Sequence, residues 1–329
     1  MTARMNRRLA LAGLPALLAA PAVLRGAAAQ TAPAAAASAA PQAPGFYRFK
    51  VGGFTVTTVH DGFFERPVAG FVRNAPLVEV QKVLAESFLP TDTLRIPFTV
   101  TFVETPAGLV VFDAGNGATA AGDTRGRMIA NMAAAGLDPA KVTKVIQSHF
   151  HGDHVNGLLN AAGGAAFPNA EIIVPAVEWA WWSDTGNETR SPEGQRPNFA
   201  NSARRFGPYQ GKIRQAAEGA EVAPGIRGVP AYGHTPGHTC YHIADGGQEA
   251  MFIADLTNRP ELLARRPDFH IVFDFDAALA EASRRRVYDR VAADRIRITG
   301  YHFPFPANGY MVKEGDGYRF VPADWSSAV

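Results

Sequence analysis

The stretch Ser148-His149-Phe150-His151-Gly152-Asp153-His154 places four side chains that can bind a metal within six residues. Residues 142–147 precede it and are rich in apolar and β-branched side chains, which predicts a buried strand. Residues 155–159 follow it and are able to begin a helix. The motif is therefore expected on a strand-to-helix turn, where a rigid strand holds several side chains at one point.

The clustering of these side chains separates them from ordinary histidines. A lone histidine is usually a core or surface residue, and an aspartate before a helix is usually its N-cap. Here three of the nine histidines in the chain lie within one window of six residues. Imidazole and carboxylate groups together are the ligands of zinc and similar divalent ions. The sequence therefore predicts that this motif binds metal.

Three later segments end in side chains of the same kind. Residues 233–239 form a Gly/Pro loop, GHTPGHT, with His234 at the predicted end of a strand. Two apolar segments end in Asp255 and in His302. Because an apolar strand that ends in one polar residue presents it at the edge of a sheet, these residues are expected to complete the metal site.

These motifs together resemble the metallo-β-lactamase superfamily over roughly residues 46–321: HxHxDH at 149–154, GHTPGH at 233–238, Asp255 and His302. Within it the chain is most similar to the methyl parathion hydrolases and the related quorum-quenching lactonases. The supporting segments are APGFY at 43–47, AFPNA at 166–170 and GYRFVP at 317–322. The resemblance implies an α/β fold, a four-layer αββα sandwich in which two mixed β-sheets pack together with helices outside.

The resemblance also implies two divalent metal ions, with zinc expected before cobalt, manganese or iron. The implied ligands are His149, His151 and His234 for one ion, Asp153, His154 and His302 for the other, and Asp255 as the bridge between them.

Other polar residues are assigned supporting or ordinary roles. Asp113, in Phe-Asp-Ala-Gly, matches a structural motif of the family and is expected to support the metal loops. His238 is expected to orient a ligand rather than to bind metal. His60, His242 and His270 have no partner motif and are expected to be ordinary residues.

The implied reaction is hydrolysis by a hydroxide that bridges two ions about 3.5–4 Å apart and attacks a carbonyl or phosphoryl centre. Asp255 would contribute to catalysis as the bridging ligand, and Asp153 or a metal-bound water is the candidate proton donor to the leaving group. No serine or cysteine nucleophile is then required. The single cysteine, Cys240, lies in a predicted strand and is expected to be a buried structural thiol.

The expected substrate is a neutral, apolar small molecule, with a lactone or carboxylic ester ranked first and a phosphotriester of the methyl parathion type second. Aromatic residues in two segments are predicted to overhang the metals: Phe63, Phe64 and Phe71 in one, and Trp179, Trp181, Trp182 and Phe199 in the other. The alternative is that these rings only pack the helices. Trp179, Phe64 and Phe199 are taken as substrate-binding, with Trp179 first because a tryptophan at this point lines the pocket in the resembling hydrolases. Residues 117–121 are small where the parathion-hydrolysing enzymes carry a phenylalanine, which favours an acyl chain.

Two rival functions remain open. A non-hydrolytic di-iron oxidoreductase of the same fold would normally carry a flavin domain, and none is expected here. A binding or scaffold protein would have a degenerate site, whereas the ligand set here is complete. Among hydrolases, a common dizinc β-lactamase would use a cysteine near the position of Asp255, and a glyoxalase-type thioesterase would carry a basic glutathione site that is not evident.

The first 29 residues read as a secretory signal peptide. Arg7 and Arg8 precede an Ala/Leu-rich segment at 9–24, and small residues at 27–29 offer a cleavage site. The paired arginines fit a twin-arginine signal. Two prolines and an arginine interrupt the apolar segment, which argues against a membrane anchor. The protein is therefore expected to be exported to the periplasm or secreted, with a linker at 30–45, a hydrolase domain at 46–329, and no membrane attachment after signal removal.

Charge and composition limit the partners. The chain of 329 residues is 47% apolar, enough to bury a large core. Lysine and arginine total 32 against 30 acids, and the first 29 residues hold four arginines and no acid. The remainder has 28 bases against 30 acids, a net charge of −2 instead of +2. This balance, without a basic run, argues against a nucleic-acid partner. A homodimer is left open.

Overall fold

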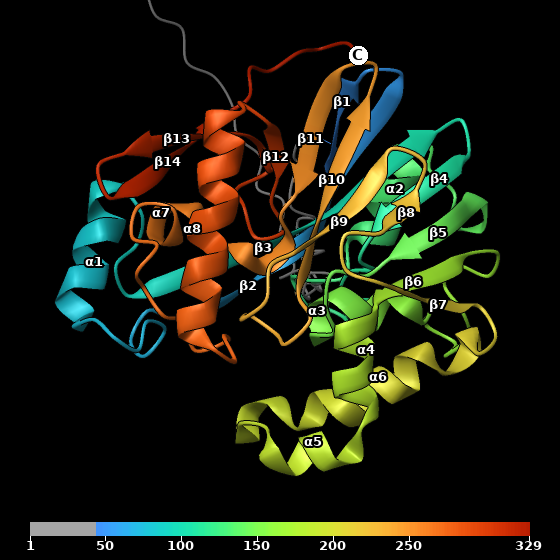
Figure 1. The fold of residues 1–329 in the computed structure, drawn as a ribbon, viewed down its shortest axis with the longest axis horizontal. Coiled ribbons are helices and arrows are strands. Elements are labelled where there is room, and N and C mark those ends of the chain that lie inside the picture. The colour runs from blue at the N-terminus through green and yellow to red at the C-terminus, as the bar shows by residue number, and fades with distance from the viewer. Residues whose placement is uncertain (1–43) are drawn as a thin grey trace, which may run out of the picture. The chain divides into compact units, whose positions relative to one another are not determined.

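Two mixed β-sheets of seven strands each form the centre of the described protein (Figure 1). The structure is a computed structural model that describes residues 44–329. The predicted signal peptide at 1–29 and most of the predicted linker lie outside the described residues. The first sheet has the order β1 (Phe46–Val51), β2 (Phe54–Pro67), β3 (Thr93–Thr105), β4 (Gly108–Phe112), β5 (Val142–Ile146), β6 (Glu171–Pro175) and β7 (Ile213–Ala216). The second has the order β14 (Gly317–Pro322), β13 (Asn308–Glu314), β12 (Arg297–Thr299), β11 (Gln248–Phe252), β10 (Thr239–Asp245), β9 (Ile226–Pro230) and β8 (Glu221–Ala223).

The two sheets pack face to face through apolar and aromatic side chains. Phe112 on β4 stacks on Phe252 of β11, with ring centroids 5.0 Å apart, and on Tyr241 of β10 at 5.3 Å. All three rings are buried, as the apolar sequences of these strands predict. Strands β4 to β7 pair in parallel, whereas β1 to β4 pair antiparallel, so the sheet is mixed.

Helices cover the outer faces of both sheets. On the second sheet, α8 (Ala277–Ala293) begins where the Asp276 side chain accepts a hydrogen bond from the Leu279 amide, and it packs Val287 and Val291 into a core with β11 and β12. The remaining helices are α1 (Leu77–Glu86), α2 (Met128–Ala134), α3 (Gly152–Val155), α4 (Ala176–Ser183), α5 (Thr185–Arg190), α6 (Pro197–Phe206) and α7 (Pro260–Leu263). In Figure 1, α1, α7 and α8 lie on one side of the sheets, and α4 to α6 lie at the bottom of the view. The predicted fold class is confirmed.

The segment of Phe63, Phe64 and Phe71, predicted to overhang the metals, is divided between a strand and a separate core. β2 continues to Pro67, so Phe63 and Phe64 lie on a strand. The register shifts between His60 and Gly62, where a positive φ of 101° lets the strand bulge and continue. Phe71 is buried in a separate core with α1 and α7. Between residues 44 and 329, no helix is long and apolar enough to cross a membrane.

Candidate metal centre

Segments that follow three strands carry most of the predicted ligands. β5 leads into the HxHxDH motif, within which α3 begins at Gly152. β11 leads to Asp255 in the short 3₁₀ helix Ala254–Leu256, and β12 leads to His302. His234 lies in the loop between β9 and β10. The helix expected to begin in residues 155–159 instead begins within the motif, since α3 ends at Val155 and only a 3₁₀ turn, Asn156–Leu158, follows it.

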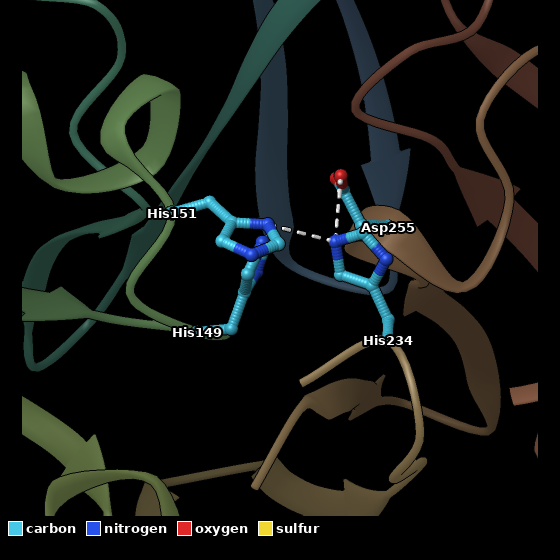
Figure 2. Close-up of side chains that lie close together, drawn as sticks. All are labelled: His149, His151, His234 and Asp255. Carbon is cyan, nitrogen blue, oxygen red and sulfur yellow. Dashed lines mark hydrogen bonds and ion pairs between the residues drawn. The ribbon is translucent and has the colours of Figure 1, made fainter. Parts of the chain in front are cut away.

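The seven predicted ligands form two clusters that share one residue. The first cluster is His149, His151, His234 and Asp255, and the second cluster is Asp153, His154, Asp255 and His302. Within each cluster the atoms able to bind a metal lie within 4.8 Å of one another. In Figure 2 the side chains of the first cluster converge from separate segments. The structure thus brings together every side chain that the sequence predicts as a ligand.

Several polar atoms in these clusters have no hydrogen-bond partner within the described part of the chain. They are Nε2 of His149, His151 and His154 and Oδ1 of Asp255. The last two lie 3.1 Å apart but not in hydrogen-bond geometry. Leaving a buried polar atom unpaired costs about 1–3 kcal/mol, so nearly all such atoms have a partner. Unused imidazole nitrogens and a carboxylate oxygen that face one space fit a divalent cation such as zinc.

Contacts on the far side of the imidazoles hold two ligands of the second cluster in place. Nδ1 of His154 lies 2.7 Å from Oδ2 of Asp113, and Nδ1 of His302 lies 2.9 Å from the carbonyl oxygen of Pro97. The carbonyl of Pro97 can only accept, so His302 carries its proton on Nδ1. Such contacts orient the rings so that Nε2 points into the second cluster, where Nε2 of His302 lies 2.9 Å from Oδ2 of Asp255.

Asp113 supports both ends of the motif, as the sequence predicts. It is fully buried and accepts hydrogen bonds from the amide and the hydroxyl of Ser148, each at 2.7 Å, as well as contacting His154. The Ser148 hydroxyl also lies 2.9 Å from Nδ1 of His149. One carboxylate therefore positions an imidazole of each cluster.

A buried ion pair lies behind His234 of the first cluster. Nδ1 of His234 lies 2.8 Å from Oδ1 of Asp274, and Oδ2 of Asp274 lies 3.5 Å from the Arg284 guanidinium. Arg284 on α8 is buried and also donates to the carbonyl of Leu256, the residue after Asp255. A helix remote in sequence therefore supports two ligands.

The other four histidines lie outside both clusters. His238 is buried, and its Nε2 accepts a hydrogen bond from the amide of Asp255 at 3.1 Å, which agrees with an orienting role. His60 packs against Phe305, His242 lies near Glu249, and His270 lies near Glu281.

Cys240 is buried and free, as expected. Burial raises the pKa of its thiol, which opposes a nucleophilic role.

Burial and nearby charges shift the pKa values of the imidazoles of the first cluster in opposite directions. Burial, and then the charge of His234, lowers the pKa of His151 to about 3, and burial also lowers the pKa of His149. Burial alone would lower the pKa of His234 too, but Asp255 and Asp274 outweigh it and raise the pKa to about 9. In the metal-free protein, His149 and His151 are therefore ready to bind a metal, whereas His234 holds a proton that a metal must displace.

A cavity of about 350 Å³ opens over the clusters. Four ligands reach it: His151, Asp153, Asp255 and His302. Its aromatic lining is Phe64, Phe98 and Phe273, and its polar lining includes Asn116, Arg125, Gln195, Asn198 and Asn258. Phe64 therefore lies where the sequence predicts. The amides and the guanidinium were not predicted, and they give the cavity a more polar wall than expected.

Trp179 and Phe199 do not line this cavity. Both line a second cavity of about 610 Å³, on the side of α4 and α6 that faces β7. Trp179 packs edge to face against Phe206, with ring centroids 5.4 Å apart, and Phe199 packs on Trp182 at 4.6 Å. The expectation that these two rings overhang the metals is therefore corrected, because each ring packs against an aromatic residue of the other helix.

Comparison with known proteins agrees with the metal site that the geometry indicates. A sequence model of the metallo-β-lactamase superfamily matches residues 98–295, more than half of the chain. The chain belongs to the metallo-β-lactamase superfamily. Its HxHxDH motif, His234 and Asp255 lie inside the matched range, which therefore holds every predicted ligand except His302.

Within the superfamily, lactonases are among its relatives. An N-acyl homoserine lactonase from Bacillus sp. is 25% identical over 252 residues, which cover 71% of this chain and 88% of the relative. The N-acyl homoserine lactonase AttM of Azorhizobium caulinodans is 31% identical over 104 residues, which cover 26% of this chain and only 37% of AttM.

Solved structures share the fold over most of the chain. AidC, a dizinc quorum-quenching lactonase in complex with a homoserine product, has a TM-score of 0.80 at 23% identity and covers 86% of this chain and 99% of its own. The hydrolase AbOPH has a TM-score of 0.81 at 25% identity, with 87% and 100% covered. Together with the family match and the lactonase relatives, these likenesses confirm the resemblance to the superfamily and to its quorum-quenching lactonases.

Sequence reasoning found Asp113 and His238 but missed other buried polar residues around the ligands. Asp61 accepts hydrogen bonds from the amide and side chain of Asn116, which it holds at the cavity wall. Glu178 is buried and is the only acid in the apolar helix α4, an available signal that was not used. Arg284 lies among other charged residues of α8, so no local pattern marks it as buried.

Proposed function

We propose that this protein is a dinuclear metal hydrolase that opens lactones or cleaves carboxylic esters. That it is a metal-dependent hydrolase follows from superfamily membership and from its lactonase relatives. The observation that carries the finer proposal is the pair of clusters sharing Asp255, in which Nε2 of His149, His151 and His154 has no hydrogen-bond partner. We propose zinc first, because five imidazoles and two carboxylates suit it.

Two divalent ions held in these clusters would polarise the oxygen of the group under attack and lower the pKa of a water molecule. The chain itself orients the ligands. Asp255 directs Oδ2 toward His302 at 2.9 Å and Oδ1 toward His154 at 3.1 Å, so its two oxygens face different imidazoles. Asp153 lines the cavity, and its side chain is 25% exposed, which suits a carboxylate that passes a proton to the leaving group.

The cavity wall supports a substrate with both an apolar and a hydrogen-bonding part. Phe64, Phe98 and Phe273 offer apolar contact, and the side-chain amides of Asn198 and Asn258 offer hydrogen bonds. We rank a lactone or carboxylic ester first, because the curated relatives are N-acyl homoserine lactonases. A phosphotriester is the second candidate, since the same chemistry reaches a phosphoryl centre.

A hydrolysis panel on zinc-loaded protein tests the ranking. It should include N-acyl homoserine lactones with short and long chains, an aryl ester, a phosphotriester and a β-lactam. We expect the highest kcat/KM for a lactone and no turnover after chelation. A phosphotriester that is cleaved faster than every lactone and ester would reverse the ranking.

We also propose that the protein is exported, on the basis of the sequence at residues 1–29. N-terminal sequencing of protein from a cell fraction tests this. A mature N-terminus near residue 30 in the periplasm or medium is expected, and an intact Met1 in a soluble cytoplasmic pool would count against export.

A further inference from the structure

One buried carboxylate contacts both loops that carry the imidazoles of the first cluster. Glu178, on α4, has no solvent exposure. Its Oε1 accepts a hydrogen bond from the amide of Phe150 at 3.0 Å. Its Oε2 accepts from the hydroxyl of Thr235 at 2.8 Å and from the amide of Gly237 at 2.7 Å. The two oxygens thus bind two loops that are remote in sequence.

These donors lie directly beside the proposed metal ligands. Phe150 stands between His149 and His151, and Thr235 follows His234. All three imidazoles of the first cluster therefore lie on backbone that Glu178 holds. The ligands of the second cluster are supported differently, since His154 contacts Asp113 and His302 contacts a backbone carbonyl.

We propose that Glu178 is a positioning residue that keeps the two imidazole-bearing loops at the separation the first metal requires. The proposal rests on the dinuclear site of the proposed function. Glu178 touches neither cavity wall nor ligand side chain, and it acts only through the loops.

The hydrogen-bond pattern requires a carboxylate at this position. Oε1 accepts a second hydrogen bond from Nε1 of Trp182 at 2.6 Å, so each oxygen accepts two. A carboxylate is an acceptor at both oxygens, whereas an amide offers one acceptor and one donor group. A glutamine would place its NH₂ group against the N–H of Gly237, or against those of Phe150 and Trp182. Neither orientation satisfies all four donors.

Close packing is independent evidence that the loop of His234 and Gly237 contacts α4. A Cβ atom added to Gly237 would lie 2.2 Å from the amide nitrogen of Glu178 and 2.6 Å from its Cα. The loop backbone therefore approaches the helix backbone at a distance that only glycine permits. The close contact and the hydrogen bonds together fix the position of the His234 loop against α4.

Glu178→Gln tests the proposal, with Glu171→Gln as the matched control. Glu171 is a partly exposed carboxylate at the start of β6. It forms ion pairs with Lys144 and Arg214, which are not in the metal-binding loops. Zinc ions per chain are counted by elemental analysis after equilibration with increasing chelator. Thermal unfolding and circular dichroism confirm that each variant is folded.

Wild type and Glu171→Gln are expected to retain two ions over the same chelator range. Glu178→Gln is expected to release one ion at a chelator concentration about 10–100-fold lower, the range found for partners of metal ligands. Excess zinc should restore most of its kcat, with KM little changed. A purely structural role would lower the thermal midpoint without moving the chelator midpoint.

Equal chelator midpoints for folded Glu178→Gln and wild type would overturn the proposal. If Glu178→Gln does not fold, Thr235→Ala removes one of the four donors, and a smaller shift in the same direction is expected; no shift would again overturn it. A wild-type protein that never holds two ions would instead refute the proposed dinuclear function.

Discussion

Replacing Arg284 by methionine tests the structural support behind the metal centre. The guanidinium is buried on α8, lies 3.5 Å from Asp274, and donates to the carbonyl oxygens of Leu256 at 3.0 Å and Pro267 at 2.6 Å. Methionine has a similar length and no charge. Arg284 also donates to the carbonyl oxygen of Phe269 at 3.3 Å. The variant would therefore leave three carbonyls without this donor and the buried Asp274 carboxylate with His234 as its remaining partner.

The expected loss is large because the pair is fully buried. Removing one partner of a buried ion pair typically costs about 3–5 kcal/mol, since the remaining charge stays desolvated. The neighbouring residue offers a control on the same helix. Arg285 is paired with Glu281 at 2.9 Å, but its side chain is 35% exposed. Arg285→Met should therefore cost less than about 1 kcal/mol.

Urea unfolding followed by fluorescence measures both variants. All samples need the same free zinc concentration, because bound metal adds to the apparent free energy of unfolding. The m value should be unchanged, so that a shift in midpoint reports stability. If Arg284→Met loses no more free energy than Arg285→Met, the buried pair is not the support that the structure indicates.

Three further expectations concern the cavity and the metals. Asp255→Ala should lower metal content and rate more than Asp153→Ala, because Asp255 belongs to both clusters; retained metal and rate in Asp255→Ala would refute this. Phe64→Ala should raise KM for apolar esters several-fold, whereas Trp179→Ala should leave KM within about twofold, since only Phe64 lines the cavity over the metals. His234 has its pKa raised to about 9 by nearby carboxylates against the effect of burial, so it is protonated at pH 7 in the metal-free protein. Zinc must displace that proton, so the affinity of this cluster for zinc should rise as pH increases from 7 toward 9, by up to about tenfold per pH unit. Calorimetry in buffers of different ionisation enthalpy should show proton release on zinc binding. The absence of proton release would contradict the expectation.

The sequence was sufficient to predict the ligands because each follows an apolar strand or sits in a short motif. His149 to His154 have a spacing that few structural roles would require, and Asp255 and His302 each end an apolar segment. Their convergence in two clusters follows from the order of strands in the sheets. Local pattern and tertiary structure agree at these positions.

The surroundings of the ligands were less predictable because they depend on how helices are rotated. Trp179 and Phe199 have the right chemistry for a substrate pocket, but the orientation of α4 and α6 turns them into another cavity. Arg284 lies 29 residues after Asp255 in a charged helix, and nothing local shows which of its arginines is buried. The extension of β2 through a bulge likewise depends on pairing with β3, which propensity does not encode.

The number of metal ions per chain tests the central claim most directly. Protein purified without chelator should be analysed for zinc, cobalt, manganese and iron, alongside its lactone hydrolysis rate. Two clusters that share Asp255 predict close to two ions per chain, and loss of either ion should lower the rate. A reproducible value near one ion per chain with full activity would contradict the dinuclear site.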